Sequence, residues 1–162
     1  MDYEIQIATL EDKETLRNLL QFYIYDFSEF MDLHFEENGK YGDYPIDEYW
    51  TTDPNYPYLI RLNGKIVGVA LVKLKNRNSD VYFSIAEFFI AKKYRRVGLG
   101  KLVAKDIFDL HKGQWEVYQI DNNKPAQHFW KKVIEEYTDG KFTERIEEGR
   151  RTQVFASHDQ SL

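Results

Sequence analysis

The stretch VYFSIAEFFIAKKYRRVGLGKL, residues 81–102, decides the fold. Residues 81–91 form an almost unbroken apolar run, which predicts a strand that is covered on both faces and therefore central in its sheet. Residues 92–102 follow with cationic side chains and two glycines two positions apart. A helix should begin there, because apolar residues recur at helical spacing at Leu99, Val103, Ile107 and Leu110.

The glycine loop between this strand and this helix has two interpretations. Free backbone N–H groups at a helix N-terminus, together with the helix dipole, favour a phosphate group. Gly98 and Gly100 would let the backbone turn tightly and approach a ligand, since glycine has no Cβ, while Arg95, Arg96 and Lys101 add positive charge. The spacing fits neither the Walker pattern nor G-x-G-x-x-G. On these residues alone, a solvated basic turn at a strand end remains the alternative.

The N-terminal part predicts a strand followed by a helix. Residues 3–8 alternate as a half-buried strand does. Thr9 has the character of an N-cap, with Asp12 three residues further on in a variant of the capping box. The residues that define a long amphipathic first helix are Leu16, Leu19, Leu20, Tyr23, Phe27 and Phe30.

The middle of the chain predicts an irregular segment and then a hairpin. Residues 31–56 mix carboxylates with aromatic residues at weak periodicity, which indicates a short second helix within loops. Residues 58–74 predict two strands joined at Asn63-Gly64, a dipeptide that favours a type I′ turn.

The C-terminal part completes the order of elements. Residues 115–120 predict a strand, and Pro125 is well tolerated near the start of a helix. Residues 141–157 predict two strands with a turn near Glu148-Gly149. The whole order predicts an α/β (α+β) fold, a mixed, mostly antiparallel, twisted sheet of six to seven strands with helices on both faces. The apolar residues of the last helix are Ala126, Phe129, Trp130, Val133 and Tyr137.

Length and composition limit the class of protein. The chain has 162 residues, a length that predicts one domain over residues 1–162, with a ragged end at residues 156–162. It has no cysteine, so it has no disulfide framework and no cysteine-based metal site. No apolar run approaches the ~20 residues that span a bilayer. The net charge of −5 argues against nucleic acid as a partner. We therefore expect a soluble, cytoplasmic protein that binds no membrane.

The loop and its context resemble a known family. The acyl-coenzyme A signature [QR]-x-x-G-x-[GA] of the GCN5-related N-acetyltransferases (GNAT) stands here at residues 95–100, as Arg95-Arg96-Val97-Gly98-Leu99-Gly100. The first strand and helix and the hairpin at residues 62–72 are similar to the family's elements. Residues 123–130, with Asn123, Ala126, Phe129 and Trp130, resemble the N-x-x-A-x-x-[FL]-Y segment of the family's last helix.

The resemblance implies an enzyme that transfers acetyl from acetyl-CoA to a primary amine, with no metal or further cofactor. It implies that backbone N–H groups of Arg96, Val97, Gly98, Leu99, Gly100 and Lys101 bind the pyrophosphate. The end of the central strand, at Phe89, Ile90 and Ala91, would pair its backbone with the pantetheine arm, near a backbone N–H that stabilises the oxyanion. Asn123 would contact the pantetheine or the nearby backbone.

The chemistry requires a base, because only an unprotonated amine attacks a thioester. Glu87 is the one carboxylate in residues 81–91 and lies on the strand face of Phe89, so burial would raise its pKa and favour it as the general base. The alternatives are a structural ion pair of Glu87, or a base among the carboxylates of residues 26–48 that acts through water.

An acid for the departing thiolate is harder to assign. The family often uses a tyrosine at the position of Trp130, whose indole N–H does not titrate in this range. Trp130 would then line the thioester site or simply pack in the core. Tyr118 and His128 are possible substitutes without a supporting motif, and Tyr137 is expected to pack.

The acceptor side is expected in residues 25–50, where carboxylates and aromatic residues interleave. Such a mixture suits a small cationic amine or a lysine side chain, through charge and cation–π contacts. A solvated acidic face is the alternative. Two other functions remain open. One is an acyl-CoA-binding module of the same fold without catalysis. The other is an interaction protein whose exposed aromatic residues form the face of a homodimer, in which the final strands, especially TQVFA at residues 152–156, pair across a two-fold axis.

Overall fold

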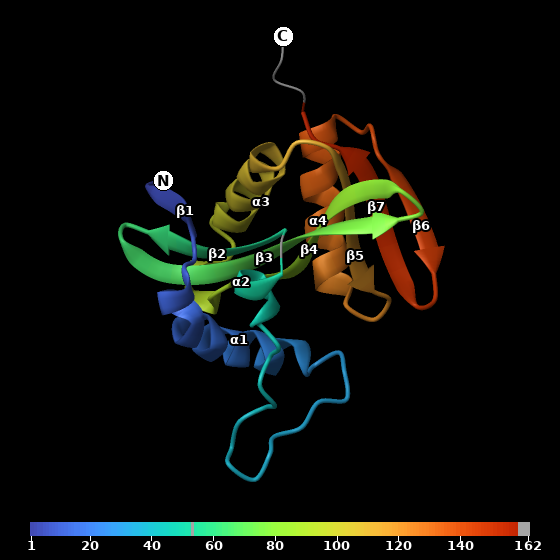
Figure 1. The fold of residues 1–162 in the computed structure, drawn as a ribbon. Helices are drawn as coiled ribbons and strands as arrows, with labels where there is room; N and C mark the ends of the chain where they lie inside the picture. The colour runs from blue at the N-terminus through green and yellow to red at the C-terminus, as the bar shows by residue number, and fades with distance from the viewer. Residues whose placement is uncertain (53, 159–162) are drawn as a thin grey trace. The chain divides into compact units, whose positions relative to one another are not determined.

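The computed structural model describes residues 1–52 and 54–158, and its elements follow the predicted order (Figure 1). The strands form a seven-stranded sheet in the order β1-β2-β3-β4-β5-β7-β6. β4 and β5 pair in parallel, whereas β1–β2, β5–β7 and β6–β7 pair antiparallel. The mixed, mostly antiparallel sheet with helices is thus confirmed. The elements are β1 (Tyr3–Ile7), η1 (Leu10–Asp12), α1 (Lys13–Phe27), α2 (Glu48–Thr51), β2 (Asn55–Leu62), β3 (Lys65–Arg77), β4 (Asp80–Ile90), η2 (Lys92–Tyr94), α3 (Leu99–Leu110), β5 (Gln114–Ile120), α4 (Lys124–Thr138), β6 (Thr143–Glu147) and β7 (Arg150–Ala156).

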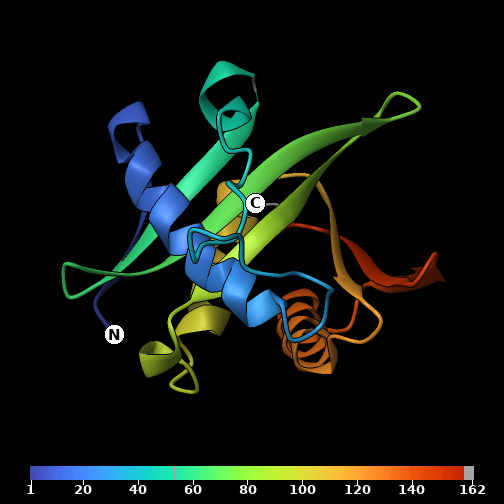
Figure 2. The same cartoon turned by 90° about the horizontal axis from the view of Figure 1, so that it is seen from below.

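Contacts divide the chain into two compact units. The first consists of Met1–Val72 and Ala86–Lys93, and the second of Lys73–Ile85 and Tyr94–Leu162. β3 and β4, the long pair of green ribbons in Figure 2, each contribute residues to both units. One domain over residues 1–162 therefore stays a prediction, and each unit is described by itself.

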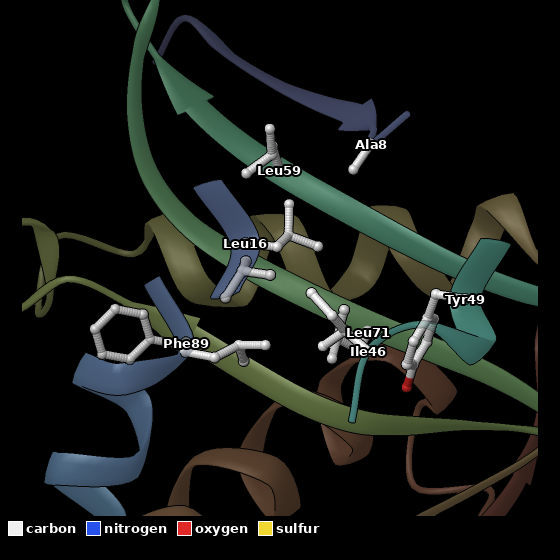
Figure 3. Packing of buried hydrophobic residues seen from close by; sticks show 9 residues of the cluster. Ala8, Leu16, Ile46, Tyr49, Leu59, Leu71 and Phe89 are labelled. Atoms are coloured by element: carbon white, nitrogen blue, oxygen red, sulfur yellow. The ribbon is translucent and has the colours of Figure 1, made fainter. Parts of the chain in front are cut away.

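The first unit holds an aliphatic core between α1 and its strands. Leu16 and Leu20 of α1 are fully buried and pack with Leu59, Leu71 and neighbouring residues (Figure 3). At the β2–β3 turn, Asn63 and Gly64 have φ values of 52° and 80°, the left-handed pair that a type I′ turn needs. The predicted hairpin and short second helix are both confirmed.

Within the first unit, Gly68 of β3 and the end of β4 approach closely. A Cβ added at Gly68 would lie 2.3 Å from the Phe89 carbonyl oxygen, so no larger residue fits without moving the backbone. Next to it, the Ala91 N–H donates to the Val67 carbonyl oxygen at 2.8 Å. Gly68 therefore allows the pairing that fixes the end of β4.

The second unit has an aromatic core. Phe108 of α3 packs edge-on against Trp115 and Phe155, with ring centroids 5.0 and 4.9 Å apart, and Tyr137 of α4 packs against the same Phe108 ring at 5.1 Å. β5 and β7 present these rings on one face. Both α3 and α4 therefore lie on the face of Trp115 and Phe155.

Four expectations from the sequence are wrong in detail. α1 ends at Phe27, where the Ser28 hydroxyl donates to the Tyr25 carbonyl oxygen at 2.6 Å, so Phe30 lies beyond the helix. Leu110 is 55% exposed, because Phe108 takes the buried position near the end of α3. Val81 is 48% exposed, since β4 is buried only further along its length.

The fourth correction concerns the pairing of TQVFA across a two-fold axis; a homodimer as such stays a prediction. β7 is not an edge strand, because it pairs with β5 on one side and β6 on the other. Residues 152–154 have ladder partners on both sides, so their backbone cannot also pair with a second copy of the chain.

Candidate functional site

The glycine loop lies at the start of α3 in the second unit. Arg96 and Gly98 both have left-handed backbones, with φ values of 65° and 86°. A Cβ at Gly98 would meet nothing within 4 Å, so the backbone conformation, and not crowding, is what favours glycine there. Leu99, which follows directly, is fully buried and anchors the first turn of the helix.

The N-terminus of α3 leaves backbone donors open. The Leu102 N–H donates to the Gly98 carbonyl oxygen at 3.2 Å, and this is where the helix's own hydrogen bonds begin. The N–H groups of Leu99, Gly100 and Lys101 precede that bond, so helix geometry gives them no acceptor within α3. Gly98 provides no side-chain cap, and the first turn has no acidic residue. This arrangement favours an external anion.

Positive charge surrounds this helix end unevenly. Arg96 and Val97 are exposed, and Arg95 is half-buried. The Lys101 ammonium lies 3.1 Å from a carboxylate oxygen of Glu136 on α4, which Lys105 also contacts at 3.0 Å. These contacts lower the pKa of Glu136, with Lys105 as the larger cause. Arg96 is therefore the loop cation most open to a ligand, and Lys101 shares its charge with Glu136.

The two site residues predicted on α4 lie in structural roles. Asn123 is the N-cap of α4, and its side-chain oxygen accepts from the Ala126 N–H at 3.2 Å. Trp130 is 7% exposed and packs against Phe129 and Phe108, with ring centroids 4.9 and 6.3 Å apart. The contact of Asn123 with nearby backbone is thus seen, as is the packing of Trp130.

The remaining predicted residues belong to the first unit. Phe89 and Ile90 are buried at the end of β4, and Phe89 lies edge-on to Tyr23 of α1 at 6.4 Å. The Ala91 N–H is already bonded to Val67, so it is not available to a ligand. Successive amides of a strand point to opposite edges, so the Ile90 N–H points away from β3.

Glu87 is half-buried and lies close enough to Tyr49 for its charge to act on that phenol. Burial raises the pKa of the Tyr49 phenol, and electrostatic interactions with Tyr44 and Glu87 raise it further. The Tyr49 side chain is 4% exposed and borders the aliphatic cluster (Figure 3). The sequence did not link Tyr44 or Tyr49 to Glu87, because no fixed spacing relates a loop residue to a strand residue.

The acidic stretch does not form a pocket of carboxylates. Residues 31–40 are all exposed. Asp47 forms an ion pair with Lys13, whose hydrogen bond lowers the pKa of that carboxyl. Gln21 holds the returning loop, since its side chain accepts from the Tyr41 N–H at 2.9 Å and donates to the Tyr41 carbonyl oxygen at 3.2 Å. These contacts fit a solvated acidic face anchored on α1.

The side chains considered as alternative acids for the thiolate do not gather at one place in the structure. The Tyr137 hydroxyl donates to Asp109 at 2.7 Å and accepts from the His158 N–H at 2.9 Å, so it packs as expected. Burial raises the pKa of Tyr137, and Asp109 raises it further. Tyr118 and His128 are exposed on β5 and α4.

Two kinds of feature are absent from the described part of the chain. Residues 1–52 and 54–158 contain no group of three or more His, Asp or Glu side chains that could hold a metal ion. No helix in that same part is long and apolar enough to cross a membrane.

The fold and the strand–loop–helix arrangement define an acyltransferase-like α/β protein. The sequence model of the acetyltransferase (GNAT) family matches residues 19–134, and the chain belongs to that family. A comparison with curated protein sequences finds no match.

Solved structures with this fold have low sequence identity to the chain. An acetyltransferase from Thermus thermophilus has a TM-score of 0.66 at 16% identity, over 96% of this chain and 97% of its own. PaiA N-acetyltransferase from Thermoplasma acidophilum, in complex with coenzyme A, has a TM-score of 0.63 at 13% identity, over 96% and 99%. Arabidopsis thaliana Naa50, in complex with the bisubstrate analogue CoA-Ac-MVNAL, has 0.59 at 15%, over 95% and 97%.

Proposed function

We propose that the protein is an N-acetyltransferase that transfers the acetyl group of acetyl-CoA to a primary amine by direct attack in a ternary complex. The observation that carries this proposal is the open N-terminus of α3 behind the left-handed Gly98. Family membership supports it, as do the coenzyme A complex of the Thermoplasma protein and the bisubstrate complex of the Arabidopsis protein.

The residues at the start of α3 fit a pyrophosphate. The amides of Leu99, Gly100 and Lys101 would donate to its oxygens, with the amides of Arg96, Val97 and Gly98 on the approach. Arg96 supplies exposed positive charge, and Arg95 orients the loop more than it touches phosphate. Because Gly98 has no side chain and open space around it, an anion can come close to the backbone.

The other cofactor contacts come from the end of β4 and from α4. Phe89 and Ile90 would hold the pantetheine arm through the backbone of β4, and Ala91 would take part only through its carbonyl oxygen, since its N–H is used by Val67. Asn123 and Trp130 would act by fixing the start of α4 and by packing, as their contacts favour.

The transfer needs a path for two protons. A nitrogen–carbon bond forms at the acetyl carbonyl, the carbon–sulfur bond breaks, and coenzyme A leaves as a thiolate. One proton leaves the acceptor ammonium before the attack and passes to a base, for which we propose Glu87, whose charge acts on the Tyr49 phenol. A second proton leaves the nitrogen as the amide forms and passes to the departing thiolate or to water. The acceptor would be a small cationic amine or a peptide, as the acidic and aromatic residues of the segment 25–50 favour.

Glu87 is tested by a pH–rate profile. Glu87→Gln should lower kcat/KM by about 100-fold and remove the acidic limb of the profile. Tyr49→Phe is a matched control that keeps the packing and the carboxylate. If the limb and kcat/KM persist in Glu87→Gln, the base lies elsewhere, for example among the carboxylates of residues 26–48.

The cofactor assignment is tested by calorimetric titration with coenzyme A. Gly98→Glu should abolish measurable binding, because its side chain brings negative charge to the open helix end. Gly64→Glu is the matched control, since Gly64 has a similar φ of 80° and equally open surroundings at the β2–β3 turn. Unchanged affinity in Gly98→Glu would overturn the assignment. Tight binding without thiol release on a panel of amines would favour a non-catalytic binding module.

A further inference from the structure

The sheet of the second unit has a face without a helix. Trp115 and Phe155 point toward α3 and α4. Alternation along the strands places Glu116 and Tyr118 of β5 on the opposite face. In the described residues of this unit, α3 and α4 are the two α-helices, so this opposite face carries none.

Cationic side chains gather on that face. Lys73, Lys75 and Arg77 alternate along the end of β3, and Arg77 binds the Glu116 carboxylate with two contacts of 2.9 and 3.1 Å. Arg145 of β6 reaches the same carboxylate at 2.8 Å. Burial raises the pKa of Glu116, but the hydrogen bonds from the two arginines outweigh it and leave that pKa lowered. The term basic face is used below for the side chains of Lys73, Lys75, Arg77, Arg145 and Arg150.

The carboxylates of Glu116 and Glu147 are both engaged by arginines of the basic face, since Glu147 binds Arg145 at 2.7 Å. Glu116 is 13% exposed and engaged by two guanidinium groups. Within residues 1–52 and 54–158, neither Lys75 nor Arg150 forms a salt bridge. Burial lowers the pKa of Lys75, and the charges of Lys73 and Arg150 lower it further, while Glu116 acts in the opposite direction. Lys75 therefore lies among more positive than negative charges.

Aromatic rings hold two of the guanidinium groups in place. Arg150 lies over the Tyr118 ring at 4.8 Å, and Arg77 lies over the Tyr82 ring at 4.9 Å. A guanidinium that is held flat loses less rotamer entropy when it binds a planar or tetrahedral oxyanion. The basic face is thus ordered before any ligand arrives.

We propose that Lys75 and Arg150 bind an anionic group, a carboxylate or phosphate carried by a small molecule. The basic face has the opposite sign to the chain as a whole, whose net charge is −5. Lys75 is half-buried among its neighbours, and a compact anion fits beside such an ammonium better than a broad acidic protein surface does. This site is separate from the start of α3 and does not depend on the proposed transfer.

The first test uses inorganic phosphate and succinate as probes, with ¹⁵N-labelled full chain. We expect saturable shifts of the backbone amides around Lys75, Tyr118 and Arg150, with a Kd of about 1 mM. Arg150→Gln and Lys75→Gln should each weaken binding by at least about tenfold. Lys65→Gln, the same charge change on an exposed lysine of β3, should leave it unchanged. Arg150 is exposed, so its variant should fold even if Lys75→Gln does not.

Three results would overturn the proposal: shifts that never saturate, shifts that persist in Arg150→Gln, or binding of an acidic polypeptide such as polyglutamate with no response to either small anion. A kinetic arm then identifies the source of the anion. Phosphate that competes with an amino acid acceptor, but not with the amide of that amino acid, places the anionic group on the acceptor. Phosphate that changes the rate without such competition identifies a separate effector.

Discussion

The two long helices of the second unit begin in opposite ways. α4 begins after Asn123, whose side chain accepts from the Ala126 N–H, and has Pro125, which has no N–H to satisfy, in its first turn. α3 begins after Gly98, with no side-chain cap and no acidic residue in the first turn. At the start of α4 the chain itself supplies an acceptor for a backbone N–H. At the start of α3 the first backbone N–H groups are left for a ligand.

This difference shows that the start of α3, which would bind a ligand, is less stabilised by its own residues than the start of α4. A capping side chain contributes about 1 kcal/mol, which α3 gives up at Gly98. α3 is instead held by burial of Leu99 and Val103 and by contacts at its C-terminal end. There the His111 carbonyl oxygen accepts from the Trp115 indole N–H at 2.9 Å and from the Ser157 hydroxyl at 3.2 Å.

The largest predicted effect concerns His111, which follows the C-terminal end of α3. Burial lowers the pKa of His111 to about 4, below the 6.5 of an exposed histidine. The unfolded chain therefore binds the proton more readily, so stability is complete above pH 6.5 and is lost as the pH falls toward 4. The expected loss is about 3 kcal/mol. Urea denaturation at a series of pH values measures it.

The control for this effect is His111→Phe, which keeps a ring between Phe83 and Trp115. It should remove most of the acid sensitivity between pH 6.5 and 4. An unchanged pH dependence in this variant would mean that other groups cause the loss.

A smaller effect is expected at the capped start of α4. Asn123→Ala should lower the free energy of unfolding by about 1 kcal/mol, because the Ala126 N–H loses its acceptor. Asn123→Asp keeps the acceptor and should stay within about 0.5 kcal/mol of the parent protein. Denaturant titration checks both values. Equal losses in the two variants would show that Asn123 does not act as a cap.

The smallest effect concerns the link between the two helices. Glu136→Gln removes the carboxylate that Lys101 and Lys105 share. Coenzyme A affinity should then rise by about two- to threefold at low salt and hardly at all near 1 M salt, because exposed charges are screened. Calorimetry at two salt concentrations measures the change. Weaker binding would mean that Glu136 positions Lys101 instead of competing for it.

The sequence predicted the order of elements well, because local patterns determine them. Asn63-Gly64 defined its turn, and the apolar run at residues 81–91 correctly marked a central strand. It failed where the outcome depends on distant partners. TQVFA alternates like any strand, and only its pairing with both β5 and β6 shows that it is internal.

The candidate site was predictable to a similar degree. The glycines at positions 98 and 100 indicated a tight backbone at the start of a helix, and the structure has that backbone. The sequence led us to expect that Asn123 contacts the pantetheine or the nearby backbone, and its role as the N-cap of α4 was not specified. The proximity of Glu87 to Tyr49 and the charges around Lys75 were not anticipated, because they join residues from different elements.

The central claim is that the open start of α3 binds the pyrophosphate of coenzyme A. Backbone amide spectra of ¹⁵N-labelled protein during a coenzyme A titration test it most directly. We predict saturable shifts of the Leu99, Gly100 and Lys101 amides that exceed the shift of the Ala126 amide, which already has an acceptor in Asn123. Saturable binding that leaves the three α3 amides unmoved would contradict the claim.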